Sequence, residues 1–210
     1  MATADDYVHH FEPARDPAAR TLMLVLHGTG GNEHDLLPLG RMIAPRAALL
    51  SPRGDVLENG MPRFFRRLAE GVFDVEDLRA RTAALADWIP VAALAHGADP
   101  ARVVAVGFSN GANIAASVLL LRPGVLAGAV LLSPMVPLEP DTPPALDGCP
   151  VLIAYGRQDP LAPPAQPEGL AGLLRDGGAD VTVAPFDGGH TVTPGTLRIA
   201  QDWLAQHFDV

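Results

Sequence analysis

Cysteine is almost absent from this chain of 210 residues, since Cys149 is the only one. A single cysteine excludes an internal disulfide and is compatible with a reducing compartment. The first ten residues include acidic side chains and no apolar run, so no signal peptide is visible. No stretch approaches the ~20 apolar residues that a membrane span requires. We therefore expect a cytoplasmic protein.

Basic residues are also scarce. Lys and Arg number 15 against 24 acidic residues, and the formal net charge is -9. This balance argues against nucleic acid and against an anionic membrane surface as partners. The 21 glycines and 21 prolines are scattered, which predicts many tight turns and no disordered tract. With 48% apolar residues and no visible linker, we expect residues 1–210 to form a single domain.

Short runs rich in Val, Leu and Ile alternate with helical patterns along the chain. Continuous apolar runs are typical of strands buried on both faces, as in parallel sheets. The predicted strands are Thr21-Leu26, Ala47-Ser51, Arg102-Phe108, Gly128-Ser133, Val151-Gly156 and Asp180-Phe186. Helices are predicted from Val75, with Pro90 kinking or dividing the first, and over Asn110-Leu121, around Leu170-Arg175 and over Thr196-Phe208. The alternation predicts an α/β fold with a doubly wound, mostly parallel sheet.

The strongest motif is Gly107-Phe108-Ser109-Asn110-Gly111, a G-x-S-x-G between a predicted strand and a predicted helix. This context is that of a nucleophile elbow, in which a serine lies on a sharp strand-to-helix turn. A serine hydroxyl needs an adjacent base, and in this fold an acid and then a histidine follow it in the chain. Asp159 and His190 each come just after a predicted strand. Since parallel strands end at one edge, we predict a Ser109, Asp159 and His190 triad.

Other polar residues fit catalysis less well. Asp147 precedes its strand, and Asp187 is close to His190 in the chain, where a supporting role stays open. His96 and His207 are interpreted as surface residues. The adjacent His9 and His10 lack further ligands, so no metal site is predicted.

A second glycine-rich turn, His27-Gly28-Thr29-Gly30-Gly31-Asn32, follows the first strand. It predicts an oxyanion hole made of the backbone N–H groups of Thr29 and Asn110, with His27 as a structural hydrogen-bonding residue. The turn fits neither nucleotide-binding pattern, so no cofactor is predicted.

The segment Pro52-Asp74 lacks clear periodicity, and a loop of this length is often functional or a lid. Within it, Phe64 and Phe65 are predicted to form an apolar acyl pocket, and Arg63 to meet an acidic substrate group. The alternative is a surface loop with solvated arginines.

Together these motifs resemble the phospholipase/carboxylesterase family of α/β-hydrolases, in its branch of small bacterial serine carboxylesterases. The resemblance rests on LHGTGGN, SPRG, RFFRR, GFSNG, GRQDP and GGH, from about Thr21 to Phe208. It implies little or no cap domain, hydrolysis of small carboxylic esters through an acyl-enzyme intermediate, and a possible homodimer. A thioesterase or acyltransferase, and a non-catalytic binding protein with a hydrolase fold, are the alternatives.

Overall fold

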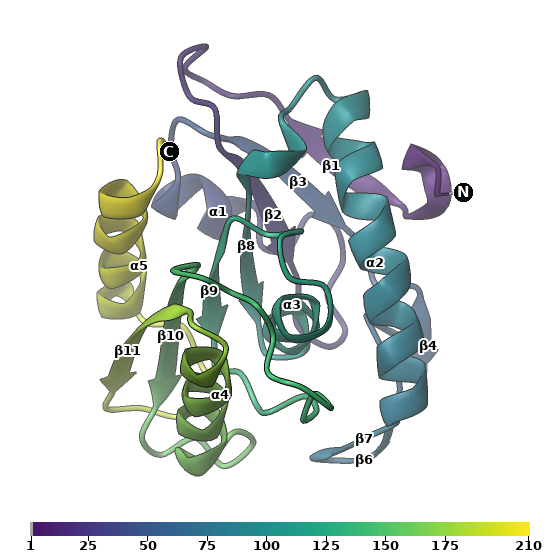
Figure 1. Cartoon of the computed structure of the whole chain (residues 1–210), viewed down its shortest axis with the longest axis vertical. Helices are drawn as coiled ribbons and strands as arrows, with labels where there is room; N and C mark the ends of the chain where they lie inside the picture. Colours follow the sequence, from purple (N-terminus) through teal and green to yellow (C-terminus); the bar gives the residue numbers. More distant parts are fainter. Residues whose placement is uncertain (1) are drawn as a thin grey trace.

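A seven-stranded sheet lies at the centre of the computed structural model, which describes residues 2–210 (Figure 1). The strand order is β1-β3-β2-β8-β9-β10-β11. Only β1 runs antiparallel to its neighbour, and the other pairs are parallel. The strands are β1 (His9–Glu12), β2 (Leu22–Leu26), β3 (Ala48–Pro52), β8 (Val103–Phe108), β9 (Gly128–Leu132), β10 (Pro150–Gly156) and β11 (Asp180–Phe186).

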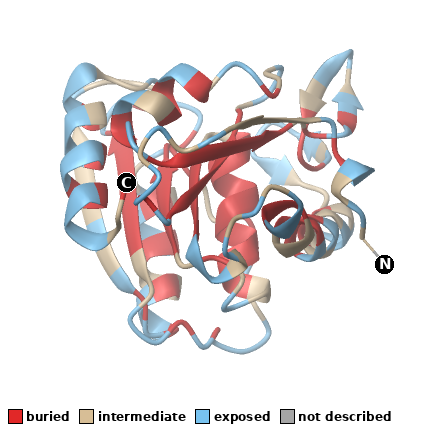
Figure 2. Ribbon diagram, turned by 90° about the horizontal axis from the view of Figure 1, so that it is seen from above, coloured by how far each residue is buried: buried red, intermediate tan, exposed pale blue. Residues whose placement is uncertain are grey.

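The apolar runs form central strands because both of their faces are buried. In β2, Leu22, Leu24 and Leu26 belong to one core cluster, while Met23 and Val25 belong to the cluster on the other face. Successive side chains of a strand point to opposite faces, so an unbroken apolar run supplies two cores at once. Figure 2 shows these strands buried between helices whose outer faces are exposed.

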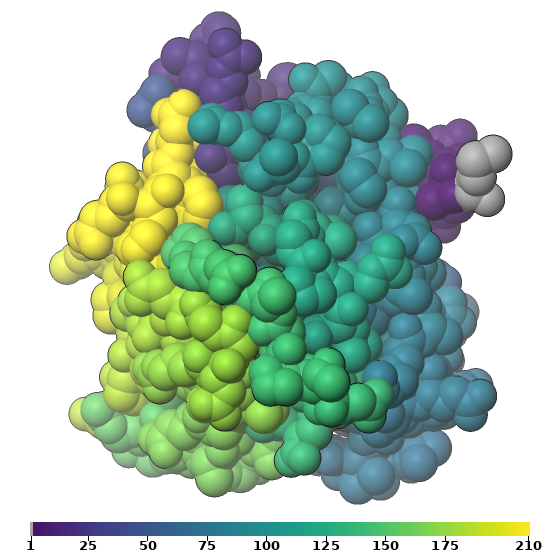
Figure 3. Space-filling view, viewed as in Figure 1, coloured from purple at the N-terminus to yellow at the C-terminus, as the bar shows by residue number. Residues whose placement is uncertain are grey.

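Helices cover both faces of the sheet. Residues of α2, α3 and α4 belong to the first cluster, and residues of α1 and α5 to the second. Figure 3 shows how the helices and loops on the first side close over the sheet. The bounds are η1 (Ala4–Asp6), α1 (Leu37–Ile43), α2 (Val75–Ala95), η2 (Pro100–Arg102), α3 (Asn110–Leu121), α4 (Ala165–Asp176) and α5 (Pro194–His207). This arrangement confirms the predicted α/β class and doubly wound sheet.

Helix α2 runs past Pro90 as one element, so the alternative that the proline divides it is wrong. The helix is held at its start and along its length. At its start the side chain of Asp74 accepts a hydrogen bond from the backbone N–H of Asp77 (3.1 Å). Further along, Trp88 is fully buried and donates from Nε1 to the carbonyl of Ala4 (2.9 Å). Packing of this kind offsets the hydrogen bond that a proline removes.

Residues 52–74 form two small hairpins and not an irregular loop. One joins β4 (Val56–Glu58) to β5 (Met61–Arg63), and the other joins β6 (Arg67–Ala69) to β7 (Val72–Phe73). The first turns at Asn59 and Gly60, both with positive φ (52° and 80°). Asn-Gly is the residue pair that favours such a two-residue turn. Figure 1 shows the second hairpin beside the start of α2, at the edge where the parallel strands end.

The six predicted strands agree with the structure to within one residue at each end. Strand β1 and helix α1 were not predicted. The first is a short edge strand of mixed polarity, and the second contains both a proline and a glycine in seven residues.

Candidate active site

Ser109 lies on a strained turn between β8 and α3. Its φ is 53° and its ψ is -115°, a conformation that a residue with a side chain rarely adopts. The turn is tight because α3 begins directly against β2. A Cβ placed on Gly111 would lie 2.1 Å from the carbonyl oxygen of Leu26. Only glycine permits this approach, and the strain exposes the serine at the carboxyl edge of the sheet.

Asp159 and His190 are joined at the same edge. His190 Nδ1 lies 2.7 Å from Asp159 Oδ2, after strands β11 and β10 respectively. The other carboxylate oxygen accepts hydrogen bonds from the backbone N–H groups of Leu161 (2.9 Å) and Ala162 (3.0 Å). Asp159 is buried, with 3% of its surface exposed. A carboxylate fixed in this way orients the imidazole so that Nε2 is left for chemistry.

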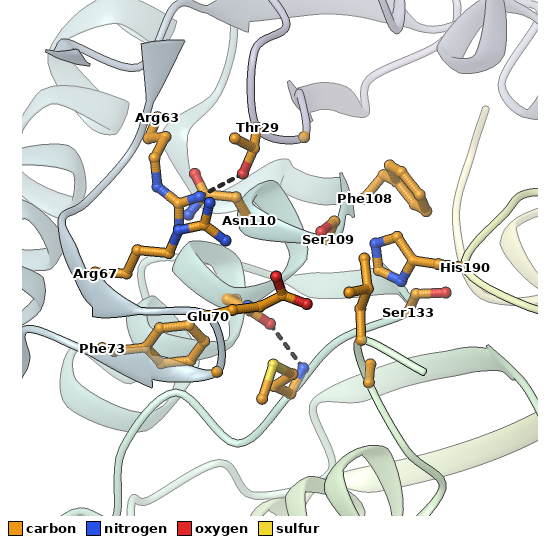
Figure 4. A pocket seen from close by; sticks show the side chains of 16 residues that line it. Thr29, Arg63, Arg67, Glu70, Phe73, Phe108, Ser109, Asn110, Ser133 and His190 are labelled. Atoms are coloured by element: carbon orange, nitrogen blue, oxygen red, sulfur yellow. Dashed lines mark hydrogen bonds between the residues drawn. The ribbon is translucent and has the colours of Figure 1, made fainter. Parts of the chain in front are cut away.

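A cavity of about 270 Å³ brings Ser109 and His190 together, and Figure 4 shows the two side chains on one side of it. The ring of Phe108 lies 5.0 Å from that of His190, between centroids. The full lining is Gly28, Thr29, Arg63, Arg67, Glu70, Gly71, Phe73, Phe108, Ser109, Asn110, Asn113, Ser133, Met135, Leu161, Ala162 and His190. The cavity therefore joins the predicted nucleophile and base with residues of both hairpins.

The turn after β2 lies beside Ser109. Within residues 2–210, the backbone N–H groups of Thr29 and Asn110 have no hydrogen-bond acceptor. Asn110 is the first residue of α3, where backbone N–H groups have no partner inside the helix. The turn is held by a hydrogen bond from the N–H of Gly30 to the carbonyl of Pro62 (2.9 Å). Two free N–H groups at one cavity are what an oxyanion hole requires.

The side chain of His27 connects this turn to the loop after β3. Its Nδ1 lies 2.7 Å from the carbonyl oxygen of Gly28, and its Nε2 accepts from the N–H of Gly54 (2.9 Å). A carbonyl at Nδ1 and a donor at Nε2 define the neutral tautomer protonated at Nδ1. Burial lowers the pKa of His27, which keeps it neutral. Both nitrogens are occupied, in agreement with the structural role expected from the sequence.

The three residues predicted to bind substrate lie in different places. Arg63 lines the cavity and is buried, and its Nη1 donates to Thr29 Oγ1 (2.6 Å). Phe64 and Phe65 do not line it, and the prediction that they form its apolar wall needs correction. Both are in the core, where Phe64 lies against His27 (4.7 Å between centroids) and Phe65 against Phe73 (5.1 Å). The hydrogen bond from the N–H of Phe64 to Asn110 Oδ1 (2.8 Å) fixes the backbone at Phe64, whose side chain points into the core.

Several lining residues were not predicted. Arg67, Glu70 and Phe73 come from the second hairpin, Asn113 from α3, and Ser133 from the end of β9. Asn113 was open to prediction, because it is one turn of helix after Asn110 and shares its face. Ser133 could be recognised only from the structure. Its φ is 49°, and its buried hydroxyl has no hydrogen-bond partner within residues 2–210.

The remaining candidate residues lie elsewhere. Burial raises the pKa of the Cys149 thiol to about 11, so it stays protonated at neutral pH. Asp187 is exposed and pairs with Arg157 (3.2 Å). Residues 2–210 contain no group of three or more His, Cys, Asp or Glu side chains placed to hold a metal ion.

The other histidines make local contacts. His9 Nε2 lies 3.1 Å from His96 Nε2, and the ring of His96 stacks on Phe11. His207 is exposed and contacts the carbonyl of Trp203 (2.8 Å). Across the described chain, no helix combines the length and the apolar character needed to cross a bilayer.

Within residues 2–210 a mostly parallel sheet has helices on both faces, no cap, and a strained serine turn at its carboxyl edge, and this combination defines an α/β-hydrolase. The model of the phospholipase/carboxylesterase family matches residues 9–208, and the chain belongs to that family.

Three relatives agree with this assignment. The chain is 54% identical over 185 residues to MhqD of Bacillus subtilis (strain 168), covering 88% of this chain and 92% of the relative. The structure of the Bacillus cereus carboxylesterase superposes with a TM-score of 0.93 at 46% identity, over 97% of this chain and 95% of that one. YahD, solved with malic acid, gives 0.89 at 30% identity, over 96% and 99%. The protein is thus an esterase-type hydrolase.

Proposed function

We propose that this protein hydrolyses small carboxylic esters through an acyl-enzyme intermediate on Ser109. The observation that carries the proposal is the 2.7 Å contact between His190 Nδ1 and Asp159 Oδ2, with His190 and Ser109 lining one cavity. The cavity volume of about 270 Å³ favours a short acyl group. Relatives named as carboxylesterases support the same reaction class.

In the first half of the reaction, the Ser109 oxygen attacks the ester carbonyl carbon while His190 Nε2 takes the serine proton. The negative charge that forms on the carbonyl oxygen is stabilised by the N–H groups of Thr29 and Asn110. The carbon–oxygen bond to the alcohol then breaks, and His190 gives its proton to the departing oxygen. Asp159 holds His190 by its hydrogen bond to Nδ1 and stabilises the imidazolium when it forms.

In the second half, water enters the position that the alcohol has left. His190 takes a proton from this water, whose oxygen attacks the acyl carbon. The same two N–H groups stabilise the second oxyanion. The bond to Ser109 breaks, the serine recovers its proton from His190, and the carboxylic acid leaves.

A fluorophosphonate probe tests the nucleophile. The probe forms a covalent adduct only with an activated serine, so intact-mass measurement and peptide mapping should find one adduct, on Ser109. Ser109→Ala should take up no probe and reduce kcat by roughly 10³ to 10⁶. The matched control is Ser133→Ala, because Ser133 is another serine of the same cavity. An adduct on Ser133, or none on folded protein, would reject the proposed nucleophile.

A further inference from the structure

The cavity wall that faces Ser109 and His190 contains two guanidinium groups (Figure 4). Arg67 donates from Nε to both oxygens of Glu58 (2.9 and 3.1 Å), and Arg63 Nε lies 3.3 Å from the same carboxylate. Two guanidinium groups therefore share one carboxylate. Because arginine stays protonated in proteins, this cluster keeps one positive charge that no partner within it balances.

Two asparagines of α3 add neutral donors to the same cavity. Asn110 Oδ1 accepts from the N–H of Phe64 (2.8 Å), and Asn113 Oδ1 accepts from the N–H of Met135 (2.8 Å). Each amide therefore uses its oxygen in the protein and has its NH₂ group left as donor. Asn110 Nδ2 is buried and has no acceptor within the described residues. A buried donor without an acceptor is costly, and an oxygen atom of a ligand supplies one.

Burial raises the free-energy cost of the positive charge on Arg63. Only 3% of Arg63 is exposed. Loss of hydration, and then the like charge of Arg67, lower the pKa of Arg63 below its ordinary value. An anion bound between the two arginines would offset both effects.

Glu70 is the opposing charge in the lining of the same cavity. It lies in the turn between β6 and β7, is exposed, and in Figure 4 points its carboxylate between Arg67 and Ser133. It makes no hydrogen bond or ion pair with the other described residues. An anionic ligand therefore meets repulsion from Glu70 and attraction from the two arginines.

We propose that Arg63, Arg67, Asn110 and Asn113 form a carboxylate-binding subsite, which selects esters whose acyl group ends in a carboxylate. The inference rests on the proposed function and names its substrate class: monoesters of short dicarboxylic acids. Two guanidinium groups and two amide donors match the two oxygens of a carboxylate better than they match an alkyl end. Glu70 weakens this preference without removing it.

Three aryl esters of matched length test the subsite. They are the 4-nitrophenyl monoester of glutaric acid, its neutral isostere 4-nitrophenyl 5-oxohexanoate, and 4-nitrophenyl pentanoate, which has no oxygen at that end. The measured quantity is the ratio of kcat/KM for the glutarate ester to kcat/KM for the ketone. The neighbouring carboxylate also speeds spontaneous release, so the rate with Ser109→Ala is subtracted from every value.

We expect a ratio of about 10 or more for the wild type, the size that charge-assisted hydrogen bonds supply. Arg67→Gln should bring the ratio close to one, and Glu70→Gln should raise it several-fold. The matched control is Arg122→Gln, which should leave the ratio unchanged. Arg122 lies directly after α3, is partly exposed and pairs with Asp87 of α2. A wild-type ratio of one or less, or a ratio that survives Arg67→Gln, would overturn the proposal.

Failure of the esterase reaction itself gives a different result. In that case none of the three esters is released faster by the wild type than by Ser109→Ala. Titration calorimetry with glutarate then measures binding to the subsite independently of the reaction. Binding that is lost in Arg67→Gln would support the subsite without the reaction, whereas no binding would overturn the subsite as well.

Discussion

The two walls of the cavity are built in different ways. The wall with Ser109, Asp159 and His190 consists of short turns after parallel strands, whose positions the sheet fixes. The wall with Arg63 and Arg67 consists of two hairpins outside the sheet, held by ion pairs and by aromatic side chains that turn into the core.

This difference separates the residues that we propose react with the ester from those that we propose select it. Close backbone contacts tolerate almost no displacement, and the residues that we propose as catalytic depend on such contacts. Apart from the backbone hydrogen bond from Gly30 to Pro62, the hairpin wall meets the rest of the site through side chains, such as the hydrogen bond from Arg63 to Thr29. Side chains can be exchanged without moving the strands, so we expect relatives to differ in substrate more through this wall than through the other.

The largest effect on folding is expected at the rigid wall, in Gly111→Ala. The new Cβ would lie 2.1 Å from the carbonyl oxygen of Leu26, a backbone atom that cannot move without shifting β2. We expect the free energy of unfolding to fall by about 3 kcal/mol or more. The measurement is urea denaturation followed by circular dichroism.

Gly172→Ala is the control for this substitution. Gly172 lies inside α4, and apart from its chain neighbours and the backbone of its own helix, no heavy atom of the described residues lies within 4 Å of the place that an alanine methyl group would take. Here alanine should raise the free energy of unfolding by about 0.5 to 1 kcal/mol, as expected for glycine replaced within a helix. Equal effects of the two substitutions would mean that the turn at Ser109 is less tight than its geometry indicates.

The hairpin wall is tested by two of its phenylalanines. Phe65 is fully buried, so Phe65→Ala should lower the free energy of unfolding by about 3 kcal/mol. Phe73 is partly exposed and lines the cavity, so Phe73→Ala should lower it by about 1 kcal/mol and raise KM for small esters. Denaturation and steady-state kinetics on both variants check this. If KM changed in Phe65→Ala and not in Phe73→Ala, Phe65 would be a residue of the substrate pocket after all.

The sequence predicted the rigid wall well because its signals are local. An apolar strand followed by a glycine turn determines where Ser109 lies, and strand ends place Asp159 and His190 at the same edge. The hairpin wall was predicted poorly. Its strands have two or three residues, too few for a period, and composition alone does not tell whether a phenylalanine such as Phe64 faces the core or the cavity.

Two further predictions concern the protein in its surroundings. The homodimer follows from the family resemblance, and the cytoplasmic location from the single cysteine and the N-terminal composition. The geometry of one chain bears on neither, so both stay predictions. Light scattering of the purified protein would decide the first.

The smallest effect is expected where a salt bridge connects the loops that follow β2 and β3. Arg53 donates to both oxygens of Glu33 (2.5 and 2.6 Å), and this lowers the pKa of Glu33 from 4.5 to about 2. A lowered pKa stabilises the folded state above about pH 4.5, and this contribution disappears as the pH falls towards 2. Since Arg53 is partly exposed, we expect a contribution of about 1 kcal/mol at neutral pH.

Glu33→Gln should therefore lower the free energy of unfolding at pH 7, and the two proteins should become equally stable near pH 2. Urea denaturation at a series of pH values measures this difference. Asp87→Asn is the control, because it breaks an ion pair with Arg122 that is exposed on both sides. A difference between wild type and Glu33→Gln that stays constant from pH 7 to pH 2 would show that hydrogen bonding, and not the charge of Glu33, connects the two loops.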